Sequence, residues 1–128
     1  MTDKVLIVDD QKGIRLLLEE VFREEGWQVC CVSDGQAALW QIDVFQPNLI
    51  LMDVRMPNMS GLEAARAILQ LQPVPIIMMT AYGETDVADA ALAAGIKECI
   101  IKPFDIEKLR SVAARFRVGE IEKNVKAI

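Results

Sequence analysis

The chain of 128 residues contains no histidine. This absence excludes a Ser–His–Asp triad, a Cys–His nucleophile pair and any zinc site that uses histidine ligands. Chemistry in this chain must therefore come from the side chains of Asp, Glu, Lys, Ser, Thr, Tyr or Cys.

Cysteine is scarce, and its three copies are Cys30, Cys31 and Cys99. An odd number that includes one adjacent pair is not the pattern of a disulfide framework. Reduced thiols suit the cytoplasm, where we expect this protein to be located. The first residues lack the basic start and apolar core of a signal peptide, and no apolar run reaches transmembrane length. We therefore expect no membrane association.

Basic residues are outnumbered, with 14 Lys and Arg against 19 Asp and Glu, which gives a formal net charge of −5. Direct binding to nucleic acid is not expected, because a nonspecific binder needs a basic face. Hydrophobic residues make up 52% of the chain and charged residues 26%, which is typical of an ordinary globular protein. The length fits one domain, which we place at residues 1–118.

Five apolar segments alternate with five segments of helical periodicity. The expected strands are 5–8, 27–32, 49–52, 76–79 and 98–101, and the expected helices are 13–25, 36–45, 62–71, 84–94 and 106–118. Most of the strands are continuous apolar runs, which indicates burial on both faces. This pattern predicts an α/β fold in which helices cover both sides of a doubly wound parallel sheet, as a three-layer sandwich. Residues 119–128 extend the last helix or form a tail.

The ends of the expected strands carry polar side chains. Asp9 and Asp10 follow the first strand, Asp53 the third, Thr80 the fourth and Lys102 the fifth. Ligands of doubly wound sheets bind at the carboxyl ends of the strands. Taken alone, each residue could be a helix cap, a turn residue or a solvated charge. Together, three repelling carboxylates predict a hard divalent cation such as Mg²⁺, which prefers oxygen ligands.

Four motifs, KVLIVDDQ, LILMDVRMPNMSG, IIMMTAYGE and IKPFD, carry a family resemblance. With these motifs, the chain resembles a response-regulator receiver domain of two-component signalling over residues 4–116. The resemblance implies the flavodoxin-like (βα)5 fold, with a five-stranded parallel sheet in the order 2-1-3-4-5.

The resemblance also implies a site. Asp53 would be the phosphoacceptor, which takes a phosphoryl group from a phosphohistidine of a partner protein. Mg²⁺, or Mn²⁺ in its place, would be bound directly by Asp10, Asp53 and the backbone carbonyl of Arg55. Asp9 would act through a metal-bound water. No turnover of an independent substrate is expected.

Lys102 and Thr80 would contact oxygen atoms of the phosphoryl group, and the backbone amide of Ala81 could complete the cradle. The Lys102–Pro103 bond is usually cis in this family. One position departs from the family pattern. An aromatic residue often stands three positions before the lysine, whereas this chain has Cys99, which puts the usual aromatic rotamer switch in doubt.

The first expected helix places Ile14 in its first turn, close to the acidic pocket, with Leu17 at the edge of the apolar arc and Leu16 on the far side. An apolar rim beside such a pocket suggests a docked protein, although a broad core-facing stripe would also explain it.

This first helical segment, with AYGE and KPFD, is similar to the single-domain phosphorelay intermediate of sporulation. That resemblance implies a sensor histidine kinase and a histidine phosphotransferase as partners, and an aspartyl-phosphate phosphatase as a third. The implied contact residues are Gln11, Ile14, Leu17, Arg55, Tyr82, Pro103 and Phe104.

Other interpretations remain open. Receivers of transcription factors that act with the sigma-54 polymerase share MTAYGE and KPFD, and in that case the tail would begin a linker to further domains. A phosphatase of the haloacid dehalogenase type also uses a strand-end aspartate, Mg²⁺, a hydroxyl residue and a lysine, but its Asp-x-Asp motif is missing. A receiver-like module that is not phosphorylated would be expected to have lost part of the acidic pocket.

Overall fold

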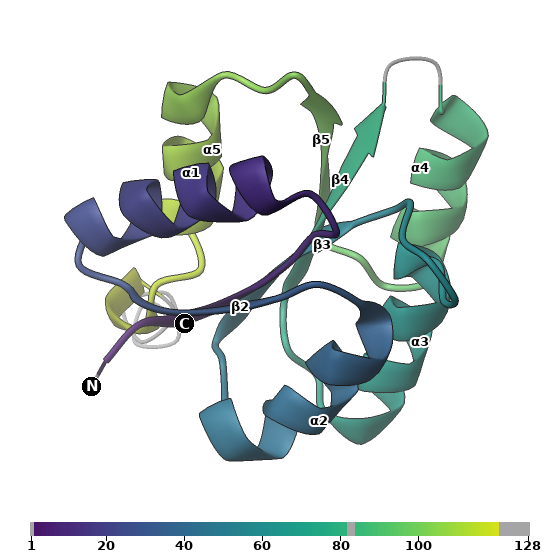
Figure 1. Ribbon diagram of the computed structural model, residues 1–128, viewed down its shortest axis with the longest axis horizontal. Helices are drawn as coiled ribbons and strands as arrows, with labels where there is room; N and C mark the ends of the chain where they lie inside the picture. Colours follow the sequence, from purple (N-terminus) through teal and green to yellow (C-terminus); the bar gives the residue numbers. More distant parts are fainter. Residues whose placement is uncertain (1, 82–83, 121–128) are drawn as a thin grey trace, which may run out of the picture.

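A parallel sheet of five strands forms the centre of the computed structural model, which describes residues 2–81 and 84–120 (Figure 1). The strand order is β2-β1-β3-β4-β5, and every neighbouring pair is parallel. This confirms the flavodoxin-like (βα)5 topology. The strands are β1 (Lys4–Val8), β2 (Gln28–Val32), β3 (Leu49–Asp53), β4 (Ile76–Ala81) and β5 (Glu98–Lys102).

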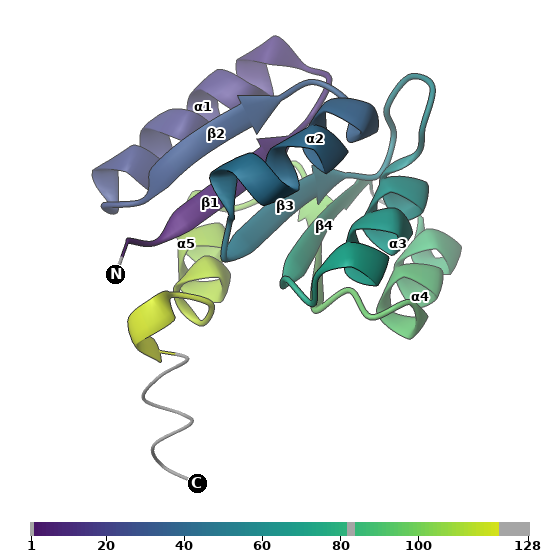
Figure 2. The same cartoon turned by 90° about the horizontal axis from the view of Figure 1, so that it is seen from below.

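Helices cover both faces of the sheet (Figure 2). On one face lie α1 (Lys12–Glu24) and α5 (Ile106–Ala114), and on the other lie α2 (Gly35–Phe45), α3 (Gly61–Leu71) and α4 (Thr85–Ala93). Two hydrophobic cores result, because alternate residues of each strand point to opposite faces. Leu6, Ile50 and Met78 belong to the core under α2, α3 and α4, while Ile7 and Leu51 belong to the core under α1 and α5.

Local signals explain where several helices begin. Asp34 caps α2 by accepting a hydrogen bond from the amide of Ala37 at 2.8 Å. Asp105 caps α5 through the amide of Glu107 at 2.9 Å. Gly26 has a φ of 89°, which stops α1 at the left-handed position where glycine is favoured. None of the helices in the described part of the chain combines the length and apolar character that a membrane span requires.

The end of α5 was predicted too late in the sequence. The helix ends at Ala114 and not near residue 118, and residues 118–120 form a separate helical turn. Hydrogen bonds to distant residues compete with the helix here. The amide of Val118 donates to Asp3 Oδ1 at 2.7 Å, and Asn48 Nδ2 donates to the carbonyl of Phe116 at 2.9 Å. The part of the predicted 119–128 segment that follows residue 120 lies outside the described residues.

Candidate functional site

The carboxyl ends of β1, β3 and β5 bring four charged side chains together. Asp9 is fully buried, Asp53 is buried and Asp10 is exposed, and their carboxylates each offer an oxygen within 4.8 Å of the others. The Nζ atom of Lys102 lies 2.7 Å from Asp9 Oδ2 and 3.4 Å from Asp53 Oδ1. The structure thus places three acids and one cation at one edge of the sheet, as the strand ends predicted.

Asp9 accepts hydrogen bonds from the protein on both oxygens of its carboxylate. Its Oδ1 accepts a hydrogen bond from the amide of Gln11 at 2.9 Å, and its Oδ2 accepts one from Lys102. Arg15 Nη1 donates to its backbone carbonyl at 2.7 Å. Both carboxylate oxygens of Asp9 therefore already have protein donors.

Asp53 is held in an environment that disfavours its charge. Burial is the main cause that raises the pKa of its carboxyl, and the neighbouring Asp9 raises it further. The charge and hydrogen bond of Lys102, and the backbone amide of Arg55, act in the opposite direction but do not cancel the rise. Without a second cation, this carboxylate therefore carries unfavourable electrostatic energy.

The loop after Asp53 must pass very close to it. The amide of Gly61, the first residue of α3, donates to the carbonyl of Val54 at 2.9 Å. A Cβ atom at Gly61 would lie 2.1 Å from the carbonyl oxygen of Asp53, well inside contact distance. Only glycine allows this approach, so Gly61 permits the β3–α3 loop to pass directly against the backbone of Asp53.

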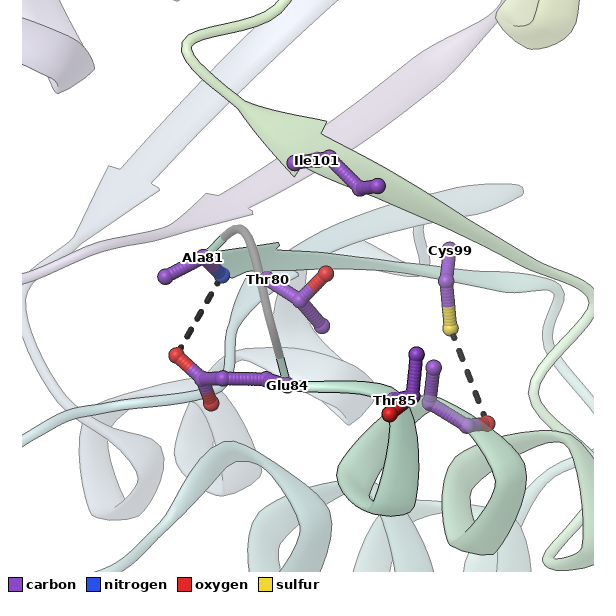
Figure 3. A pocket seen from close by; sticks show the side chains of 7 residues that line it. Thr80, Ala81, Glu84, Thr85, Cys99 and Ile101 are labelled. Carbon is purple, nitrogen blue, oxygen red and sulfur yellow. Dashed lines mark hydrogen bonds between the residues drawn. The ribbon is translucent and has the colours of Figure 1, made fainter.

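A cavity of about 280 Å³ opens onto the carboxylates. Its lining residues are Asp10, Gln11, Asp53, Val54, Arg55, Ala81, Glu84 and Lys102. Thr80 is buried at the same end of the sheet, but it does not line this cavity. It lines a neighbouring pocket of about 200 Å³ between β4, β5 and α4, together with Cys99 (Figure 3). Thr80 therefore lies beside the acidic cavity but does not line it.

Cys99 lies in that neighbouring pocket, where the family often has an aromatic ring. Its Sγ is 3.9 Å from the carbonyl of Ala88 in α4, and burial raises the pKa of its thiol. The small side chain leaves the space between α4 and β5 partly open.

Glu84 belongs to the site, although no role was predicted for it. Its Oε1 accepts hydrogen bonds from Arg55 Nε at 3.1 Å and from the amide of Ala81 at 3.3 Å. Its side chain is only 11% exposed. The acid of the AYGE motif was visible in the sequence, but an acid before a helix usually caps that helix, so the pattern gave no reason to place it in the cavity.

A second groove, of about 400 Å³, adjoins the acidic cavity. Its lining residues are Gln11, Ile14, Leu17, Lys102, Pro103 and Phe104. Five of the predicted partner contacts thus share one surface, next to the site lysine. Arg55 lines the acidic cavity and not this groove, and Tyr82 lies outside the described residues. The Lys102–Pro103 peptide bond is cis, as the resemblance implied.

The fold and the site together define a receiver of two-component signalling, and comparison with known families agrees. The family model described as response regulator receiver domain matches residues 5–114. The chain belongs to the response regulator receiver domain family. This membership favours the receiver over the haloacid dehalogenase type of phosphatase.

Relatives with curated descriptions include both short and long proteins. Sporulation initiation phosphotransferase F from Bacillus subtilis is 38% identical over 117 residues, which cover 91% of this chain and 94% of that protein. Regulatory protein AtoC from Escherichia coli is 36% identical over 114 residues, which cover 88% of this chain but only 25% of that protein. The family is therefore shared with a protein of similar length and with a much longer regulator.

Solved structures with the same fold include chemotaxis response regulator CheY4 from Vibrio cholerae. That structure has a TM-score of 0.83 and 30% identity, and the match covers 91% of this chain and 99% of that chain. The receiver domain of NtrX from Brucella abortus has a TM-score of 0.83 and 29% identity, with coverage of 87% and 95%.

Proposed function

We propose that this chain is a phosphorelay intermediate that accepts a phosphoryl group on Asp53 and passes it on. The observation that carries the proposal is the position of Asp53, which opens onto the cavity 3.4 Å from Lys102 and beside two further acids. A carboxylate at a strand end is a competent nucleophile for phosphoryl transfer, and positioned cations supply most of the catalysis.

The reaction is a displacement at phosphorus. An oxygen of Asp53 forms a P–O bond while the P–N bond to a partner's phosphohistidine breaks, and the imidazole nitrogen leaves. Transfer to a second histidine reverses these bonds. Lys102 neutralises charge that develops on the phosphoryl oxygens. The amide of Ala81, which lines the same cavity, donates a hydrogen bond to one of these oxygens. Thr80 must approach from the neighbouring pocket to contribute.

The acidic cluster fits Mg²⁺, with Mn²⁺ as a substitute. The donors that the structure gathers are carboxylate oxygens, the type that both ions prefer, and three acids face one lysine. Asp10, Asp53 and the carbonyl of Arg55 would hold the ion, while Asp9, whose oxygens are already bonded, would act through water. The bound ion would draw negative charge from the phosphoryl oxygens during transfer.

The groove formed by Gln11, Ile14, Leu17, Pro103 and Phe104 supports protein partners as donor and acceptor. It adjoins Lys102, so a helix seated in it could present a histidine to Asp53. We propose a sensor histidine kinase and a histidine phosphotransferase as partners, and an aspartyl-phosphate phosphatase as a third. The relative described as a sporulation initiation phosphotransferase supports the relay role. The three unpaired thiols support the cytoplasm as its location.

We also propose that residues 1–118 form the receiver and that residues 119–128 extend it. The second candidate function is the receiver part of a longer regulator. The relative AtoC favours it, because the match to this chain covers only 25% of that protein's length. In either case we expect transfer on Asp53 and no independent turnover.

One experiment separates the two candidates. The chain would be incubated with Mg²⁺ and labelled phospho-kinase, and a histidine phosphotransferase would then be added. Label that moves to Asp53 and on to the phosphotransferase identifies a relay intermediate. Label that reaches Asp53 and only hydrolyses identifies a terminal receiver, and label that never reaches Asp53 contradicts both candidates.

A further inference from the structure

Glu84 is in an unusual position for a residue at the start of a helix. It is the N-cap residue of α4, yet its side chain makes no cap hydrogen bond to that helix. A carboxylate at this position ordinarily accepts from the amides of the first turn. Here it turns back toward the end of β4 and accepts from the amide of Ala81 instead (Figure 3).

The donors that hold Glu84 face the phosphoacceptor's cavity. Arg55, Ala81 and Glu84 line the same cavity as Asp53. Lys102, the other donor there, is already bonded to Asp9. The carboxylate of Glu84 therefore bonds two donors of this cavity, the amide of Ala81 and the Nε of Arg55, that an incoming anion on Asp53 would also approach.

We propose that Glu84 is an internal competitor of the phosphoryl group, an inference that rests on the proposed function of Asp53. In the unphosphorylated chain, the carboxylate of Glu84 takes the place of a phosphoryl oxygen at the amide of Ala81. A phosphoryl group on Asp53 displaces this carboxylate, because two anions that approach the same N–H donor repel each other.

Displacement of the Glu84 side chain would also change the pocket next to the acidic cavity. Glu84 also lines the pocket that contains Thr80, Cys99 and Ala88, between β4, β5 and α4. Release of its side chain therefore changes the wall of this pocket and the contacts of the first turn of α4. Ala81 and Glu84 line both this pocket and the acidic cavity, and Glu84 has the larger side chain of the two.

The test measures binding of beryllofluoride, a phosphoryl mimic, at saturating Mg²⁺. Glu84→Ala removes the competitor, and Asp86→Ala is the matched control, because Asp86 is an exposed acid in the first turn of the same helix. We expect Glu84→Ala to bind beryllofluoride roughly 3- to 10-fold more tightly than the wild type, the range expected when one competing hydrogen bond is lost. Asp86→Ala should bind like the wild type.

A second readout is the amide resonance of Ala81. In the wild type it should shift when beryllofluoride replaces the carboxylate, and in Glu84→Ala it should be shifted before the mimic is added. Glu84→Gln keeps the size of the side chain and should lie between these two states, which also covers the case in which the alanine variant folds poorly.

The outcomes separate this inference from the proposed function. Equal affinities for Glu84→Ala and Asp86→Ala, or an Ala81 resonance that does not respond in the wild type, would overturn the inference while Asp53 remains the acceptor. A wild-type chain that binds no beryllofluoride would overturn the proposed function and this inference with it.

Discussion

Lys102 donates a hydrogen bond of 2.7 Å to Asp9, and this contact joins the end of β5 to the end of β1. The same ammonium group is 3.4 Å from Asp53, so in this state its shorter contact is with the acid that we do not expect to be phosphorylated. Transfer to Asp53 therefore requires Lys102 to share or exchange partners. A cation bound by the acids would compensate Asp9 when this happens.

The first prediction concerns this pair. Lys102→Ala should lower the free energy of unfolding of the metal-free chain by about 3 kcal/mol, because it leaves the fully buried Asp9 without its cation. Mg²⁺ should recover part of this loss and should still bind, while phosphorylation becomes slower. Urea unfolding with and without Mg²⁺ measures both effects. Lys97→Ala, at an exposed lysine, is the control, and loss of Mg²⁺ binding in Lys102→Ala would contradict the assigned role.

The second prediction concerns Asp53. Asp53→Asn should abolish phosphorylation and should stabilise the metal-free chain near pH 7, because it removes a buried charge. The pKa of Asp53 is raised in the folded state, so its ionised form destabilises the fold above that pKa. The penalty disappears as pH falls below the unfolded value of about 3.9.

The stability difference between Asp53→Asn and the wild type should therefore shrink as the pH is lowered from 7 toward 4. Urea unfolding of both proteins across this range, without metal, measures the difference. Asp86→Asn removes the same charge from an exposed site and controls for net charge. A difference that stays constant with pH would contradict the electrostatic explanation.

The third prediction concerns the groove. Leu17→Ala should slow transfer between this chain and its protein partners by roughly tenfold, the effect of losing a central apolar contact, because Leu17 lines the groove beside Lys102. Phosphorylation by a small-molecule donor such as acetyl phosphate should be unchanged. Leu16→Ala is a close control, since Leu16 is an exposed leucine of the same helix that lines a different surface. Equal slowing by both variants would argue against the groove as the docking site.

Much of the fold could be predicted from the sequence, because the signals were local. Continuous apolar runs gave the five strands to within one or two residues, and helical periodicity gave the starts of α2 and α5, which Asp34 and Asp105 cap, to within one residue. The strand order came from the family resemblance. The predicted end of α5 was wrong, because the chain after Ala114 forms hydrogen bonds with Asp3 and Asn48, which are far away in the sequence.

The sequence predicted that four charged side chains of the site lie together, but it did not predict which of them pair, and it gave no role to Glu84. Strand ends brought Asp9, Asp10, Asp53 and Lys102 together, since parallel strands share one edge. Which acid receives the lysine depends on side-chain packing, and no sequence pattern encodes it. The same holds for Glu84, which accepts hydrogen bonds from Arg55 and from the amide of Ala81 and none from its own helix.

The last prediction concerns two glycines with opposite surroundings. A Cβ at Gly61 would lie 2.1 Å from the backbone oxygen of Asp53, whereas a Cβ at Gly13 in α1 would meet nothing within 4 Å. Gly61→Ala should therefore destabilise the fold by about 2 kcal/mol, because the β3–α3 loop must move. Gly13→Ala should be neutral or stabilise by about 0.5 kcal/mol, since alanine favours helix.

The two variants differ in function for the same reason. Displacement of the loop moves Asp53 and the carbonyl of Arg55, so Gly61→Ala should weaken Mg²⁺ binding and slow phosphorylation even under conditions where it is fully folded. Gly13→Ala should leave both unchanged. Thermal unfolding gives the stabilities, and Mg²⁺ titration followed by labelling with a phosphodonor gives the function. A Gly61→Ala chain that binds Mg²⁺ and accepts phosphate as the wild type does would show that the close approach of this loop is not what positions Asp53.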